Sequence, residues 1–180
     1  MLFRSKRDML CARYQPRWQP RHAPPAVPAW PRRHAIVIGA GIAGTAVVER
    51  LAQRGWSLDL IERHAAAAGA TSGMHAGAFH PLLARDDSHA ARLSRAGFFY
   101  ALQRWQALDA AGHTTAWQRC GALQLAGDDT EESHMAETVR ALNGPPAYAQ
   151  FVDRDEARRL AGVALHHGGY WFAQGGWMRA

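Results

Sequence analysis

Long apolar runs and closely spaced cysteines are both missing from this 180-residue sequence. No stretch approaches the roughly 20 continuous apolar residues that a membrane helix needs, so we predict no membrane partner. The basic N-terminus is not followed by the apolar segment of a secretory signal. The two cysteines, Cys11 and Cys120, lie far apart and lack zinc-site spacing, which is typical of unpaired thiols. Because such thiols fit a reducing compartment, we expect a cytoplasmic protein.

Positive charge is concentrated at the N-terminus. Residues 1–33 hold eight Lys or Arg and one acid, a net charge of +7, whereas residues 34–180 hold 13 basic and 14 acidic residues, a net charge of −1. Six prolines in the first segment exclude a helix or a central strand there. Residues 1–33 therefore read as an extended basic linker, and a linker at this position suggests a preceding domain. Its charge could contact nucleic-acid phosphates or could simply keep a linker soluble.

From His34 onward the sequence becomes that of a globular domain. Residues 35–38 are a β-branched apolar run that ends at Gly39, which predicts a buried parallel strand. Residues 42–54 predict a helix with one apolar face, ended by Gly55, and residues 57–61 predict a second strand. Strand, helix and strand in about 30 residues indicate one βαβ unit.

The first turn of this unit is glycine-rich. It reads Gly39-Ala40-Gly41-Ile42-Ala43-Gly44, the G-x-G-x-x-G pattern. Gly39 would make the tight turn, Gly41 would let a diphosphate approach the backbone, and Gly44 would let the helix pack closely on the strand. The diphosphate would lie at the positive end of the helix. The alternative is a tight turn in some other α/β fold.

An acidic residue ends the second predicted strand. Glu62 follows Gly44 by 18 residues, the position from which a carboxylate accepts hydrogen bonds from a ribose hydroxyl and disfavours a 2′-phosphate. NAD and FAD sites share this pattern. The small-residue loop 65–78 favours FAD, because it could lie against a second part of an extended cofactor; otherwise it is a flexible surface loop.

Further elements follow this loop. They are helices at about 87–111, 130–142 and 153–160, strands at 114–117, 123–126 and 170–172 with a turn at Cys120-Gly121, and a short extended piece at 151–152.

These motifs together resemble the D-amino-acid oxidase superfamily of flavoproteins. Residues 72–83, SGMHAGAFHPLL, are similar to the S-G-N-x-x-G-x-x-x-P-L-L stretch of one group in it, the FAD-dependent half of bifunctional tRNA wobble-uridine enzymes. Residues 3–10, FRSKRDML, resemble the run that joins the two halves of those enzymes, and residues 170–177, YWFAQGGW, resemble the return from their substrate domain. Met74 stands where the family usually has Asn, which puts one polar contact near the flavin in doubt.

The resemblance implies FAD as the cofactor and a set of contact residues. The fold it implies is α/β: a Rossmann-like FAD-binding unit at 34–112 and part of an inserted α+β substrate domain at 113–180, after the linker 1–33. We expect a truncated form that lacks the methyltransferase half and a later glycine-rich segment. The expected cofactor contacts are Gly39, Ala40, Gly41, Ile42, Ala43, Gly44, Glu62, Arg63, Ser72, Gly73, His75 and Gly77.

The reaction implied by the resemblance is oxidation of a secondary amine on tRNA. Removal of the carboxymethyl group from 5-carboxymethylaminomethyl-2-thiouridine would leave the 5-aminomethyl form. Two alternatives stay open: a small-amine or D-amino-acid oxidase or dehydrogenase of the same superfamily, and a catalytically inactive nucleotide-binding fragment. No catalytic residue is assigned; His75, His80 and Arg85 are weak candidates. His166 and His167 have no carboxylate or cysteine at ligand spacing, so we predict no metal.

Overall fold

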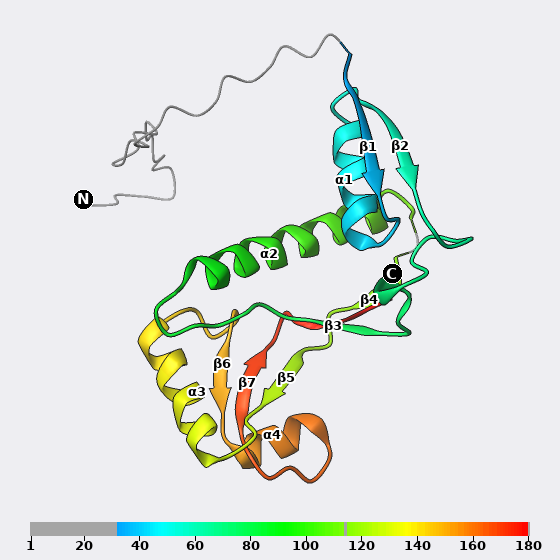
Figure 1. Ribbon diagram of the computed structural model, residues 1–180. Helices are drawn as coiled ribbons and strands as arrows, with labels where there is room; N and C mark the ends of the chain where they lie inside the picture. Colours follow the sequence, from blue (N-terminus) through cyan, green and yellow to red (C-terminus); the bar gives the residue numbers. More distant parts are fainter. Residues whose placement is uncertain (1–31, 114, 180) are drawn as a thin grey trace, which may run out of the picture. The chain divides into compact units, whose positions relative to one another are not determined.

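The computed structural model describes residues 32–113 and 115–179. Contacts divide the chain into residues 1–33 and residues 34–180. The predicted basic linker thus lies outside the described residues, except for Arg32 and Arg33. The second unit is a mixed α/β structure (Figure 1). The predicted boundary between residues 112 and 113 remains a prediction.

The unit begins with the expected βαβ arrangement (Figure 1). Strand β1 (His34–Ile38) pairs in parallel with β2 (Ser57–Ile61), and helix α1 (Ile42–Ala52) connects them. Gly55, with a φ of +77°, lies in the turn after the helix. The predicted strands, helix and parallel pairing are confirmed.

Burial of β1 was predicted incorrectly. Ile36 and Ile38 are 59% and 85% exposed, and α1 has no buried residue, although an apolar face was expected for it. Val37 faces α1, since its Cγ1 lies 3.6 Å from the position of a Cβ on Gly44. Among the described residues, β1 pairs only with β2, and α1 covers only one face of the pair. The other face therefore keeps its apolar residues in solvent.

Two further sheets follow, each of three antiparallel strands. Their strands are β3 (Gly77–Phe79), β8 (Gly176–Met178) and β4 (Trp117–Gln118) in one, and β5 (Ala122–Leu125), β7 (Gly169–Phe172) and β6 (Gln150–Val152) in the other. The sequence did not predict β3 and β8, because three-residue strands in glycine-rich segments show no periodicity.

The segment around Cys120-Gly121 is not a turn between paired strands. β4 pairs with β8 and β5 pairs with β7, so the two strands belong to different sheets. Gly121 has a φ of +87°, and a Cβ there would lie 1.9 Å from the Trp171 ring. The bend is thus shaped by the indole of β7. Thr114 of the predicted strand lies outside the described residues.

The helices were predicted within about two residues. α2 (His89–Ala110) is capped by Ser88 and follows Asp87, whose φ is +44°. α3 (Asp129–Leu142) ends at Asn143 in the left-handed region. α4 (Arg154–Ala161) begins as expected, with the Asp153 carboxylate accepting the Glu156 N–H at 2.9 Å. No described helix is long and apolar enough to cross a membrane.

The main core lies between α3 and the β5-β7-β6 sheet (Figure 1). Phe172 is fully buried there, with Met135 and Tyr170 around it. A second apolar contact centres on Phe79 of β3, whose ring lies 5.0 Å from Trp105 of α2 and 6.2 Å from Trp117 of β4. These rings hold β3, and the loop that precedes it, against α2.

Candidate cofactor site

The bend between β1 and α1 has the shape that its glycines predict. Gly39 adopts a φ of +98°, a conformation that disfavours side chains. A Cβ on Gly44 would lie 1.8 Å from the Gly39 carbonyl oxygen, so only glycine lets the helix approach this closely. A Cβ on Gly41 would lie 2.8 Å from the Ser72 Oγ atom. Gly39 is therefore favoured by its positive φ, whereas Gly41 and Gly44 are favoured by close contacts.

The N-terminus of α1 is suited to an anion. Gly41 is its N-cap, no side chain of the cap accepts a hydrogen bond, and the first turn has no acidic residue. The free N–H groups of such a terminus and the helix dipole attract negative charge. The Ser72 hydroxyl lies at the same place and accepts the Ile42 N–H at 3.1 Å. Ser72 could also donate its hydroxyl hydrogen to a phosphate oxygen.

Glu62 lies beside the bend, as its spacing predicts. Its Oε2 atom accepts the Ala40 N–H at 2.7 Å, and its Oε1 atom accepts the His64 N–H at 2.9 Å. These backbone hydrogen bonds, the one from Ala40 first, lower the pKa of the Glu62 carboxyl below its ordinary value. Each carboxylate oxygen can accept two hydrogen bonds. An ionised Glu62 thus retains capacity for a ribose hydroxyl.

The small-residue loop folds back onto the bend. The Ala68 N–H donates to the Ala40 carbonyl at 2.9 Å, and the 3-10 turn η1 (Thr71–Gly73) presents Ser72. A Cβ on Gly73 would lie 2.3 Å from the Ala68 carbonyl oxygen. The sequence did not single out Ala68, because a backbone contact leaves no side-chain signal. The reading of residues 65–78 as a flexible surface loop does not account for these contacts.

Several expected contact residues do not join this cluster. The Arg63 Nε atom donates to the neighbouring His64 ring, and His75 is exposed. Gly77 belongs to β3, opposite Met178. Ala43, by contrast, lies in the first turn of α1, and its N–H is one of the terminal amides of that helix. All twelve cofactor contacts remain predictions, but the structure brings the glycine bend, Glu62 and Ser72 together.

The weaker catalytic candidates have other contacts. The His80 ring stacks on Phe172 at a centroid distance of 5.0 Å, and its Nδ1 atom lies 3.2 Å from the Pro81 carbonyl. Arg85 forms an exposed ion pair with Glu137 at 3.1 Å. Both sets of contacts are structural, and neither marks a catalytic group.

The histidine pair has carboxylate neighbours that sequence spacing did not reveal. Asp129 and Glu132 of α3 lie within 3.4 Å of His167. The spacing argument considered only neighbours along the chain, whereas the fold brings together residues 35 and 38 positions apart.

Two bacterial proteins are similar to this chain over most of its length. Bifunctional proteins named MnmC, for tRNA 5-methylaminomethyl-2-thiouridine biosynthesis, are similar in sequence. That of Paraburkholderia xenovorans (strain LB400) is 49% identical over 174 residues, 96% of this chain and 26% of that protein. That of Burkholderia mallei (strain SAVP1) is 53% identical over 175 residues, 97% of this chain and 27% of that protein. The chain thus spans about a quarter of these relatives.

Solved structures share the fold at low sequence identity. L-proline dehydrogenase from P. horikoshii matches with a TM-score of 0.59 at 20% identity, over 82% of this chain and 38% of that one. Glycine oxidase from Bacillus cereus ATCC 14579 matches with a TM-score of 0.60 at 20% identity, over 83% of this chain and 40% of that one. The expected α/β fold class is confirmed by these neighbours. The sequence profile of the FAD dependent oxidoreductase family matches residues 34–180, so the chain belongs to that family.

Proposed function

We propose that this chain provides the diphosphate- and ribose-binding part of an FAD site in a tRNA-modifying oxidoreductase. The observation that carries the proposal is the convergence of Glu62 and Ser72 on the glycine bend, within 3.1 Å of the Ala40 and Ile42 amides. This arrangement fits a dinucleotide cofactor, because one group can hold a ribose while the helix terminus holds a diphosphate.

The chain's own residues would bind and orient the cofactor. The N-terminal amides of α1 would donate to a diphosphate oxygen, and Ser72 would rotate its hydroxyl to do the same. Glu62, kept ionised by the Ala40 and His64 amides, would accept from the ribose. Bound FAD would supply the two-electron oxidation of a carbon–nitrogen bond.

The substrate we propose is the wobble uridine of tRNA. Oxidation beside the amine nitrogen of its 5-carboxymethylaminomethyl group, followed by hydrolysis, would release glyoxylate and leave the 5-aminomethyl form. Two observations support this choice: the name shared by the relatives at 49% and 53% identity, and the net charge of +7 in residues 1–33. Because the chain spans about a quarter of those relatives, the whole reaction is proposed for the full-length protein.

FAD titration of the 180-residue chain tests the cofactor site. We expect quenching of flavin fluorescence, and an affinity at least tenfold lower in Glu62→Ala, which loses the ribose acceptor. Glu137→Ala is the matched control, since Glu137 pairs with Arg85 on the surface. Circular dichroism checks that both variants fold. Equal FAD affinity in both variants would remove the proposed role of Glu62, and no binding to the wild type would reject the site.

A tRNA titration separates the two candidate substrates. Binding that weakens steeply with salt is expected if the basic segment contacts phosphates. A chain in which residues 1–33 are deleted should lose most of this binding and keep its FAD affinity. If the chain does not bind tRNA at low salt, the second candidate, a small-amine oxidase, is favoured instead. That candidate is supported only by the family membership.

A further inference from the structure

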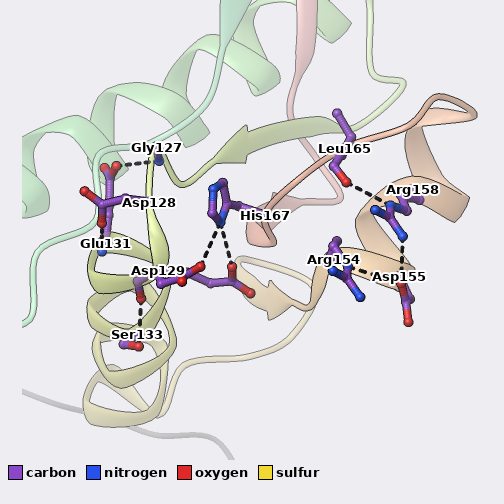
Figure 2. A network of polar contacts seen from close by, with 11 residues as sticks. Gly127, Asp128, Asp129, Glu131, Ser133, Arg154, Asp155, Arg158, Leu165 and His167 are labelled. Carbon is purple, nitrogen blue, oxygen red and sulfur yellow. Dashed lines mark hydrogen bonds and ion pairs between the residues drawn. The ribbon is translucent and has the colours of Figure 1, made fainter.

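Two carboxylates of α3 converge on one histidine nitrogen (Figure 2). The His167 Nδ1 atom lies 3.4 Å from Asp129 Oδ1 and 3.3 Å from Glu132 Oε2. One ligand atom from each of the three residues lies within 4.8 Å of the other two. His167 comes from the segment before β7, so two separate elements build this cluster.

Helix capping does not explain these two carboxylates. Asp128 accepts the Glu131 N–H at 2.7 Å, and Glu131 accepts the Gly127 N–H at 2.7 Å. This reciprocal pair gives two backbone N–H groups at the start of α3 their hydrogen-bond acceptors, as in a capping box. Asp129 and Glu132, three residues apart on one helical face, point instead at His167.

Hydrogen bonding to His167 accounts for only part of the arrangement. A ring nitrogen carries one hydrogen, so Nδ1 cannot donate fully to both carboxylates. Charge-assisted hydrogen bonds are about 2.7–2.9 Å long, shorter than either separation here. Ligand atoms about 2.0–2.1 Å from a tetrahedral zinc ion lie roughly 3.4 Å apart. The two observed separations match this ligand–ligand spacing.

We propose that Asp129, Glu132 and His167 bind a divalent metal ion that accepts tetrahedral coordination, such as zinc. Neutral imidazole and two carboxylates give the site a charge of −2, which outweighs the partial charge of about +0.5 at the helix terminus. A surface hollow beside it is also lined by Asp153, Asp155 and His166, and by Arg154, which pairs with Asp155. The Asp129 side chain is 99% exposed and can rotate toward the ion, and water would complete the coordination.

The bound metal would fasten the start of α3 to the segment that leads into β7. It would therefore stabilise the part of the fold that contains the β5-β7-β6 sheet, and not the glycine bend. This inference is independent of the proposed FAD function. It reverses the expectation drawn from the spacing of His166 and His167.

Zinc titration of the full chain by calorimetry tests the site. We expect one zinc ion per chain, with affinity reduced at least tenfold in His167→Gln and in Asp129→Asn. The matched control is His134→Gln, which removes an exposed histidine of the same helix and should bind zinc like the wild type. Because Asp129 is exposed, its variant will fold even if His167→Gln does not.

A second readout identifies the ligands directly. Cobalt(II) in place of zinc should give the strong visible absorption of a tetrahedral site in the wild type, and weak absorption in Asp129→Asn. FAD affinity should be the same in all of these chains. The proposal is overturned if the wild type binds no zinc, or if binding survives both His167→Gln and Asp129→Asn.

Discussion

Replacing Gly44 with alanine should destabilise the β1-α1-β2 unit. The new Cβ would lie 1.8 Å from the Gly39 carbonyl oxygen, whereas a carbon–oxygen contact normally needs about 3.3 Å. Relieving this overlap requires backbone movement of about 1.5 Å, at the upper end of the ~1–3 kcal/mol that overpacking costs. Alanine regains ~1 kcal/mol of helix propensity, so we expect a net loss of about 2 kcal/mol.

Gly97 provides the opposite case in the same chain. It lies within α2, and no heavy atom would come within 4 Å of a Cβ there. Gly97→Ala should therefore stabilise the chain by ~0.5–1 kcal/mol through propensity alone. At roughly 2–4 °C per kcal/mol for a chain of this size, the melting temperature should fall by about 4–8 °C in Gly44→Ala and rise by about 1–4 °C in Gly97→Ala.

Thermal and urea unfolding, followed by circular dichroism, measure both variants. Opposite shifts of melting temperature are the expected result. A Gly44→Ala chain as stable as the wild type would show that the helix does not approach the bend this closely. In that case the steric argument for the whole glycine bend would be refuted.

Three further changes test other contacts. Asp153→Ala removes the side chain that accepts the Glu156 N–H and should cost ~1 kcal/mol in urea unfolding. Gly121→Ala forces a Cβ into the Trp171 ring at a φ of +87° and should shift indole fluorescence as well as lower stability. The folded-state pKa of Glu62 is lowered, so the ionised Glu62 carboxylate stabilises the fold fully above pH 4.5, its ordinary pKa, and this stabilisation is lost as pH falls through the folded pKa. Glu62→Gln should therefore make the free energy of unfolding less dependent on pH at acid pH.

Matched variants define what would contradict these predictions. Asp153→Asn keeps a capping oxygen and should remain close to the wild type. Gly55 also has a positive φ, but nothing lies within 4 Å of its Cβ position, so Gly55→Ala should be milder than Gly121→Ala. Equal losses in either pair would contradict the contact invoked. An unchanged dependence on pH at acid pH in Glu62→Gln would contradict the pKa argument.

Local patterns made the βαβ unit predictable. About 30 consecutive residues contain both the apolar strand that ends at Gly39 and the spacing from the glycines to Glu62. The structure places Glu62 beside the bend, as this spacing predicts. The capping start at Asp153 and the helix end at Asn143 are equally local. Signals of this kind depend on backbone propensity, which the sequence carries directly.

Long-range pairings could not be predicted in this way. The pairing of β3 with β8 joins residues about 100 positions apart, and three-residue strands have too little alternation to show it. The contact of Ser72 with Ile42 was not predicted, although the family resemblance put both residues among the cofactor contacts, and the cluster at His167 was missed. In each case the partner is chosen by tertiary packing, which no single segment specifies.

The exposed side of β1 connects folding to ligand affinity. Ile36 and Ile38 leave their side chains in water, and the strand that carries them ends at the Gly39 bend. Any surface that shields these isoleucines would favour the ordered form of the strand, and hence of the loop that receives the diphosphate. By thermodynamic reciprocity, a nucleotide held at the bend would strengthen attachment at the isoleucines by the same factor.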